Sequence, residues 1–219
     1  MRRLLIAAAF LLAASSGQAQ QQQYGEPGQF DFYVLALSWS PSYCESAGNR
    51  ADPQQCSRRG ARPYAFVVHG LWPQYERGFP SDCVYNPPYV PNQLVNSMLD
   101  VMPSRRLVIY QWRKHGTCSG LNSAEYFALM RKAFEKVKIP PKFAQSTEYQ
   151  TVSPPGVENV FRASNRKGEG EMLGVPCDRR NLREVRICLT KDLEFRSCPQ
   201  VDRQACRNPR IVLPPVRGG

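Results

Sequence analysis

The stretch FVVHGLWPQ, residues 66–74, places His69 directly after a run of apolar residues. The stretch YQWRKHGTCSG, residues 110–120, places His115, the only other histidine, in similar aromatic surroundings. Each histidine is followed directly by a glycine, which lets the backbone turn sharply and lets a ligand approach closely. A strand can hold a histidine at its end while the turn leaves one ring face open. We therefore expect both histidines at the ends of buried strands, around one shared cleft.

Apolar runs bounded by turn residues predict the strands of this chain. Three runs rich in aromatic and aliphatic residues are expected to be buried strands: residues 30–39, 64–69 and 107–112. Residues 185–190 and 193–198 flank Lys191 and Asp192, which predicts an antiparallel hairpin with Cys188 and Cys198 on its arms. A last short strand is expected at residues 211–213.

Apolar residues at helical spacing predict three helices whose apolar stripes pack in the core. The first covers residues 92–102 and stops at Pro103. The second is capped by Ser123 and continues to about Lys136, and the third starts at Ser153 with a proline at its first position. Residues 165–170 are polar and predict a surface loop. The mixed order of elements, without repeats or a long linker, predicts a single α+β domain with a largely antiparallel central sheet flanked by helices.

The first 19 residues have the organisation of a secretory signal peptide. Arg2 and Arg3 precede an apolar run over residues 4–14, and small residues lead to Ala19. The mature domain is expected at residues 20–219, with a Gln-rich, flexible start at residues 20–29. No later apolar run is long enough to span a bilayer, so we expect a secreted or periplasmic protein without a membrane anchor.

Eight cysteines in an exported chain predict four disulfides, because an oxidising compartment lets them form and persist. A zinc site is the competing interpretation. None of the cysteines forms a CxxC pair, and the two histidines do not form a ligand pair on a shared turn, so we expect no bound metal. The cysteine pattern by itself leaves about 105 pairings open.

The chain is strongly basic, with 29 Lys and Arg against 18 Asp and Glu. Loss of Arg2 and Arg3 with the leader leaves a mature net charge of +9. A polyanionic partner is consistent with this charge, since basic surfaces attract phosphate backbones. The alternative is that the charge only keeps the protein soluble, and composition does not decide between the two.

Two imidazoles are well suited to proton transfer, because each can be base or acid near neutral pH. Cleavage of RNA without a metal needs such a pair, one group to take the proton of the ribose 2′-hydroxyl and one to protonate the departing 5′-oxygen. A fixed cation would stabilise the charge that develops on the phosphoryl oxygens. Lys114, next to His115, supplies a cation at one of the two histidines.

HGLWP at residues 69–73 and KHGTC at residues 114–118 resemble the two active-site segments of the ribonuclease T2 family, which includes secreted and periplasmic bacterial enzymes. The resemblance extends from FYVLALSWSPSYC, residues 32–44, to KDLEFRSCP, residues 191–199. It implies an endoribonuclease that cleaves single-stranded RNA through a 2′,3′-cyclic phosphate to 3′-phosphate ends. It also implies a monomer that needs no cofactor.

The resemblance assigns roles by position. His115 matches the general base and His69 the general acid, and the two exchange roles when the cyclic phosphate is hydrolysed. Lys114 matches the lysine that stabilises the pentacovalent phosphorane. Trp72 matches an aromatic residue on which a base stacks, a contact worth about 1 to 3 kcal/mol.

The chain also departs from the family pattern. Tyr110 and Gln111 stand where many members have His-Glu. Tyr110 can still donate a hydrogen bond to a phosphate oxygen, but the amide of Gln111 cannot carry a proton as a carboxyl does. Gln74 stands where fungal members have an acid in the base-binding region. We therefore expect a weakened or re-tuned enzyme with an open base preference.

The same resemblance implies the disulfide pairing: Cys44 with Cys56, Cys83 with Cys118, Cys177 with Cys206, and Cys188 with Cys198.

Two other functions remain open from the sequence. One is an RNA-binding or polyanion-binding protein on the same fold that has lost turnover through Gln111. The other is a disulfide-stapled extracellular toxin or interaction module in which His69 and His115 are incidental.

Overall fold

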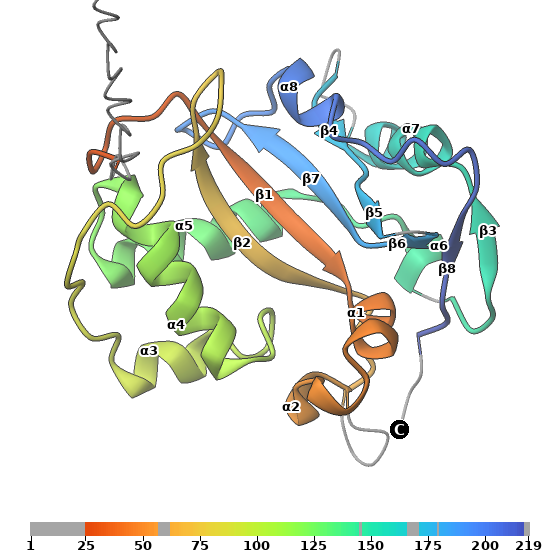
Figure 1. Cartoon of the computed structure of the whole chain (residues 1–219), viewed down its shortest axis with the longest axis horizontal. Helices are drawn as coiled ribbons and strands as arrows, with labels where there is room; N and C mark the ends of the chain where they lie inside the picture. Colours follow the sequence, from red (N-terminus) through yellow and green to blue (C-terminus); the bar gives the residue numbers. More distant parts are fainter. Residues whose placement is uncertain (1–24, 57–61, 145, 166–170, 179, 217–219) are drawn as a thin grey trace, which may run out of the picture.

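A computed structural model describes residues 25–56, 62–144, 146–165, 171–178 and 180–216, and its fold is α+β, as the sequence predicts (Figure 1). The central sheet is antiparallel throughout and has the order β2-β1-β7-β4. Its strands are β1 (Phe32–Trp39), β2 (Phe66–Gln74), β4 (Leu173–Gly174) and β7 (Glu184–Leu189). The signal peptide and residues 166–170 of the expected loop lie outside the described residues.

The two faces of β1 have different roles because side chains alternate along a strand. One face carries Tyr33, Leu35, Leu37 and Trp39, which are buried in the main hydrophobic core. The other face carries Phe32 and Val34 in a smaller cluster, followed by Ala36 and Ser38. Polar residues of the neighbouring strands β2 and β7 lie on this second face.

A β-bulge in β2 falls at His69. Val68 lies opposite Leu37 and Gly70 opposite Ala36, so His69 is an extra residue without a counterpart on β1. A bulge of this kind bends the strand and redirects its side chains. Val68 and Leu71 consequently both belong to the main core, although they are three residues apart, and Trp72 packs on the other face.

Helices surround the central sheet, and a second, smaller sheet lies beyond β7 (Figure 1). The longer helices are α1 (Ser40–Ala47), α4 (Arg105–Lys114), α5 (Ser123–Lys136) and α7 (Pro154–Ser164). Shorter helices are η1 (Gly48–Arg50), α2 (Pro53–Cys56), α3 (Asn92–Ser97), η2 (Gly116–Ser119), α6 (Pro141–Ala144) and α8 (Pro199–Asp202). The second sheet, of order β3-β8-β6-β5, consists of β3 (Gln150–Val152), β5 (Cys177–Asp178), β6 (Asn181–Leu182) and β8 (Ile211–Leu213).

The expected strand at residues 107–112 is wrong, because these residues lie within α4. Ser104 caps this helix by accepting a hydrogen bond from the Leu107 N–H, and the helix buries Val108 and Trp112, which are one turn apart. The apolar residues of this segment therefore form the buried face of a helix. His115 follows a helix and His69 lies within a strand, so neither histidine stands at the end of a strand.

Other boundaries also differ from the predictions. β2 continues through Gly70 to Gln74, and α3 ends at Ser97, short of residue 102. Residues 193–198 form no strand, and only an isolated bridge between Leu189 and Phe195 pairs them with β7. The second predicted helix is confirmed with Asn122 as its cap in place of Ser123, and the third helix and the strand at 211–213 are confirmed.

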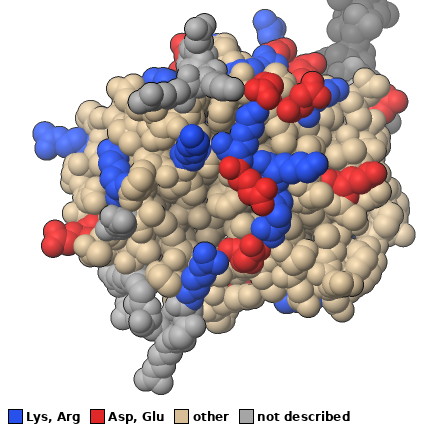
Figure 2. Space-filling view, turned by 180° about the vertical axis from the view of Figure 1, so that it is seen from behind, with Lys and Arg blue, Asp and Glu red and all other residues tan. Residues whose placement is uncertain are grey.

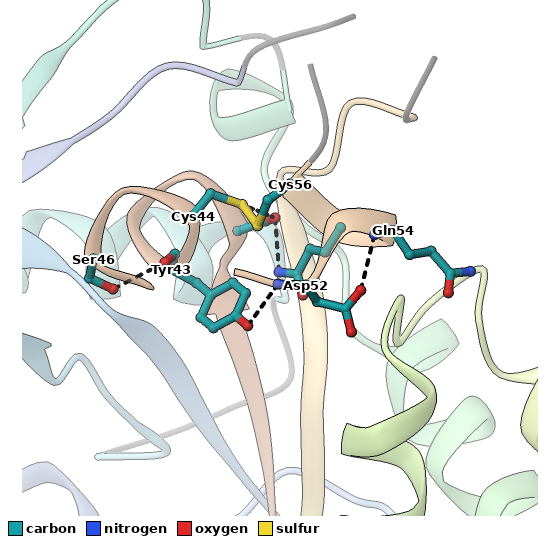
Figure 3. Close-up of a disulfide and its surroundings, with 8 residues drawn as sticks. Tyr43, Cys44, Ser46, Asp52, Gln54 and Cys56 are labelled. Carbon is teal, nitrogen blue, oxygen red and sulfur yellow. Dashed lines mark hydrogen bonds between the residues drawn. A yellow bond between two sulfur atoms is a disulfide. The ribbon is translucent and has the colours of Figure 1, made fainter. Parts of the chain in front are cut away.

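The four disulfides join the pairs that the family resemblance implies: Cys44–Cys56, Cys83–Cys118, Cys177–Cys206 and Cys188–Cys198. Figure 3 shows the first of them, between α1 and α2. The second ties η2, directly after His115, to the segment that follows β2. The N–H of Gly28 donates to the Cys118 carbonyl at 3.0 Å, so part of the N-terminal segment lies against this bridge. No helix in the described ranges is long and apolar enough to cross a membrane.

Removal of the Cys83–Cys118 bridge by the double substitution Cys83→Ser and Cys118→Ser should lower the free energy of unfolding by about 3 to 4 kcal/mol. The bridge spans 35 residues, so its loss frees a large loop in the unfolded chain. Thermal unfolding measured by circular dichroism tests this expectation. An unchanged melting temperature would contradict it, and a double serine variant at Cys44 and Cys56, which are separated by only 12 residues, should lose less.

Candidate active site

The bulge at His69 brings its ring to a buried carboxylate. His69 Nδ1 lies 2.9 Å from Glu184 Oε2, across β1 on strand β7. Arg186, two residues further along β7, forms an ion pair with Glu184 Oε1 at 2.8 Å. The exposed fraction of the Glu184 side chain is 1%, whereas that of His69 is 26%, so the carboxylate supports a ring whose other side reaches solvent.

Glu184 is ionised despite its burial. Burial by itself would raise the pKa of this carboxyl, but the hydrogen bond and charge of His69 and the charge of Arg186 outweigh it and lower the pKa to about 2. A carboxylate held at Nδ1 keeps a proton on that nitrogen and stabilises a positive charge on the ring. The Nε2 side of His69 is thereby left for chemistry.

His115 occupies a different environment. It follows α4 directly, and its N–H donates to the Gln111 carbonyl at 3.0 Å. Burial lowers its pKa to about 3, and the positive charges of Lys114 and His69 add to the effect. Its Nδ1 is buried and has no hydrogen-bond partner among the described residues. The imidazole of His115 is therefore neutral at ordinary pH.

Trp72 stands between the two histidines. Its ring centroid is 5.2 Å from that of His69 and 5.3 Å from that of His115. Its indole N–H donates to Gln111 Oε1 at 2.8 Å, and the Arg186 guanidinium lies 5.4 Å from its ring centroid. Gln111 is buried and comes from the inner face of α4, so this hydrogen bond ties the helix to β2.

The two glycines that follow the histidines serve close packing. A Cβ on Gly70 would collide with the Gln111 amide and the Trp72 indole nitrogen, and a Cβ on Gly116 would collide with the Trp112 and Tyr126 rings. Neither glycine has a positive φ, so neither is required for a left-handed backbone conformation. Tyr126 in turn donates its hydroxyl to the Leu71 carbonyl at 2.7 Å, which fixes α5 against β2.

The remaining predicted site residues lie around this centre. The Lys114 ammonium is 5.6 Å from the centroid of the Tyr110 ring, and Tyr110 is half exposed at the outer side of α4. Gln74 ends β2, and its amide donates to the Pro73 carbonyl at 2.9 Å. No group of three or more His, Cys, Asp or Glu side chains that could hold a metal ion occurs in the described part of the chain.

Comparison with known proteins places this chain in a family. Residues 30–198 match the sequence model of the Ribonuclease T2 family. The chain belongs to the ribonuclease T2 family. Its enzyme class is therefore that of T2-type endoribonucleases.

Relatives in this family cover most of the chain. A ribonuclease of Aeromonas hydrophila is 37% identical over 194 residues, which span 88% of this chain and 86% of that protein. Ribonuclease DdI of Dictyostelium discoideum is 28% identical over 83% of each chain. The solved structure of an RNase-related protein from Calystegia sepium shares the fold with a TM-score of 0.67 at 22% identity, covering 85% of this chain and 98% of that one.

Sequence reasoning missed Glu184, Arg186 and Phe79 at this candidate site. Phe79 is exposed, and its ring centroid lies 6.3 Å from that of His115. The signal for the first two was present in EVRICL, residues 184–189. Alternate residues Val185, Ile187 and Leu189 belong to the core, which places Glu184 and Arg186 together on the opposite face of the strand.

Replacing Glu184 by glutamine should lower kcat roughly ten- to a hundredfold with little change in KM. The amide can still accept a hydrogen bond from His69 Nδ1, but it no longer stabilises the protonated ring. If His69 donates a proton in the reaction, the alkaline limb of the pH–kcat profile should therefore move to lower pH.

Glu158→Gln is the matched control, because Glu158 is also a buried carboxylate paired with an arginine, Arg162, outside the site. This variant should keep the pH profile of the parent protein. An unmoved alkaline limb in Glu184→Gln would show that the carboxylate has only a structural role.

Proposed function

We propose that this chain cleaves single-stranded RNA without a metal, by transfer of the phosphoryl group to the neighbouring 2′-oxygen. The 2′-oxygen attacks phosphorus, the bond to the 5′-oxygen breaks, and a 2′,3′-cyclic phosphate forms. Water then opens the cyclic phosphate to a 3′-phosphate. The observation that carries this proposal is a pair of imidazoles that contact one indole ring and have opposite electrostatic surroundings.

His115 is the general base of the first step. Its pKa of about 3 keeps the ring neutral near physiological pH, so it is ready to accept the proton of the 2′-hydroxyl. The low pKa results from burial and from the charges of Lys114 and His69 in the free protein. A dianionic phosphorane beside the ring would offset those positive charges and so favour proton transfer as the reaction proceeds.

His69 is the general acid. Its contact with the ionised carboxylate of Glu184 supports the positively charged ring, which gives up a proton to the leaving 5′-oxygen. In the hydrolysis step the two rings exchange roles, because the reverse sequence of proton transfers opens the cyclic phosphate. One ring contacts an ionised carboxylate and the other is surrounded by positive charge, so the two rings are suited to different roles in proton transfer.

The phosphate and base contacts follow from the remaining side chains. Lys114 stabilises the charge on the phosphorane oxygens, and the Tyr110 hydroxyl can donate to one of them. Trp72, Gln74 and the exposed ring of Phe79 form the region for a nucleobase. Gln111 acts as a positioning residue, since its side chain holds the Trp72 indole.

Purified protein should cleave a defined RNA oligonucleotide in the presence of EDTA, and mass spectrometry of the products should find 2′,3′-cyclic phosphate ends that later become 3′-phosphate ends. The corresponding DNA should remain intact because it lacks the attacking 2′-hydroxyl. His69→Ala and His115→Ala should each lower kcat by a factor of roughly a thousand or more.

Circular dichroism of both alanine variants controls for folding. Intact RNA after incubation with the parent protein in chelator would contradict the proposal, and so would full activity in either alanine variant. The second outcome would instead favour an interaction module whose histidines are incidental.

An RNA-binding protein without turnover is the alternative that one observation favours. The Gln111 amide cannot act as a general acid or base, and its side-chain oxygen already accepts a hydrogen bond from Trp72. Under this alternative the parent protein leaves RNA intact and Gln111→Glu restores cleavage. Under the enzymatic proposal the parent protein is already active, and Gln111→Glu changes kcat by roughly tenfold or less, because a carboxylate can still accept the Trp72 hydrogen bond.

An oxidising compartment fits the four disulfides, and with the leader-like residues 1–19 it supports a secreted or periplasmic protein. We propose a monomer because the family resemblance implies one. Fractionation of a culture expressing the full chain would locate it, and size-exclusion chromatography would determine its oligomeric state.

A further inference from the structure

A basic hollow begins at the active-site lysine and continues along the outer side of α4. It has a volume of about 810 Å³, and we call it the α4 groove. Four cationic side chains line it: Arg50, Arg106, Arg113 and Lys114. Tyr43 and Tyr110, both partly exposed, line it as well. The groove therefore combines guanidinium groups and aromatic rings next to the proposed site of cleavage.

Helix geometry accounts for the row of side chains along one wall. Arg106, Tyr110 and Arg113 are spaced i, i+4 and i+7, so they share one face of α4. The rise of an α-helix places Arg106 and Arg113 about 10 Å apart along the axis. This is a longer distance than one phosphodiester group requires, so the row extends beyond the phosphate that reacts.

The three groove arginines are available to a ligand. Arg50, Arg106 and Arg113 form no ion pair with any residue that the structure describes, and all three are exposed. Some basic side chains elsewhere lie beside acids: Arg131 with Asp100, Lys136 with Glu194, and Arg196 with Glu76. The view from behind shows such mixing of blue and red side chains (Figure 2).

Two acids line the groove without neutralising it. Asp52 caps the start of α2, where its Oδ1 accepts the Gln54 N–H at 3.0 Å, and its own N–H donates to the Tyr43 hydroxyl at 3.3 Å (Figure 3). The backbone N–H of Asp82 donates a hydrogen bond to the Lys114 carbonyl at 2.8 Å. The groove therefore has a net positive charge, because four cationic side chains and only two carboxylates line it.

The Cys44–Cys56 disulfide gives the wall opposite α4 a fixed shape. It joins α1 to α2, and both cysteines flank the segment that carries Arg50 and Asp52. Figure 3 shows Tyr43 and Asp52 next to this bridge. Arg50 is therefore presented by a cross-linked loop, and Tyr43 directly precedes that loop on α1. The cross-link reduces the entropy lost when a ligand binds.

We propose that the α4 groove binds the phosphates of nucleotides that flank the reacting phosphodiester in a single-stranded RNA. Guanidinium groups without protein partners are the side chains best suited to bidentate phosphate contacts. Tyr43 and Tyr110 offer faces on which unpaired bases stack. This inference rests on the proposed function, and it makes the protein selective for long RNA over dinucleotides.

The test compares a dinucleoside monophosphate with a single-stranded RNA of about twelve nucleotides. In the triple variant Arg50→Gln, Arg106→Gln and Arg113→Gln, kcat/KM for the longer RNA should fall at least tenfold, mainly through KM. The fall in kcat/KM for the dinucleoside monophosphate should be much smaller than the fall for the longer RNA, because the dinucleoside monophosphate has no flanking phosphates. The negative slope of log(kcat/KM) against log(salt) for the longer RNA should become shallower by about 2, because three contacts to a single strand are lost.

A second triple variant, Lys132→Gln, Lys138→Gln and Arg207→Gln, removes the same charge from exposed residues that do not line the groove. It should keep the kcat/KM of the parent protein on both substrates. An equal loss in this variant would mean that net charge alone is responsible, and would overturn the proposal. An unchanged kcat/KM of the groove variant on the longer RNA, or an equal loss on both substrates, would also overturn it.

Binding without turnover separates this inference from the proposed function. A fluorescent 2′-O-methyl RNA of about twelve nucleotides cannot be cleaved by 2′-oxygen attack, so anisotropy measures its Kd directly. The groove variant should bind it at least tenfold more weakly than the parent protein does. A parent protein that binds this probe through the groove but leaves RNA intact would contradict the proposed function alone, and equal Kd values for the parent and the groove variant would contradict the groove.

Discussion

The site depends on one extra residue in strand β2. A strand without a bulge alternates strictly, so a core position at Val68 would place residues 70 and 72 in the core as well. Because His69 has no counterpart on β1, the alternation shifts after it, and Leu71 takes the core position instead. The shift delivers Trp72 to the face that also carries Glu184 and Arg186. The bulge thus positions the first histidine and the indole together.

The electrostatic difference between the two histidines follows from this arrangement. Strand β7 carries the buried carboxylate of Glu184, which contacts His69. Its ion pair with Arg186 offsets part of the free-energy cost of burying that charge. His115 lies at the end of α4, where Lys114 adds positive charge and burial adds desolvation. The two rings contact the same indole, so their different environments are created within a few ångströms by elements far apart in the sequence.

The sequence predicts the parts of this structure that are local or that match a known pattern. HGLWP and KHGTC identify His69, Trp72 and His115, and the resemblance supplies a disulfide pairing that cysteine spacing leaves open. The helical nature of α4 is missed because Leu107 and Val108 resemble the start of a strand, although Ser104 and the one-turn spacing of Val108 and Trp112 indicate a helix.

Glu184 is missed for a different reason. Its partner is 115 residues away, and the contact exists only once β1 pairs with β2 on one side and β7 on the other. No local propensity contains that information, since it depends on two strand registers and on the bulge between them. The alternation of EVRICL shows that Glu184 faces away from the core, but it does not show what Glu184 faces.

Helix α4 connects catalysis with substrate binding because its inner and outer faces serve different partners. Its inner face holds Trp72 through Gln111, and its last turn presents Lys114 and His115. Its outer face carries Arg106, Tyr110 and Arg113 along the α4 groove. In the proposed mechanism, a rigid helix fixes the distance between these faces, so an RNA strand held by the arginines would have its reacting phosphate placed relative to His115. The energy of these remote contacts would then contribute to orienting the 2′-oxygen for its attack on phosphorus.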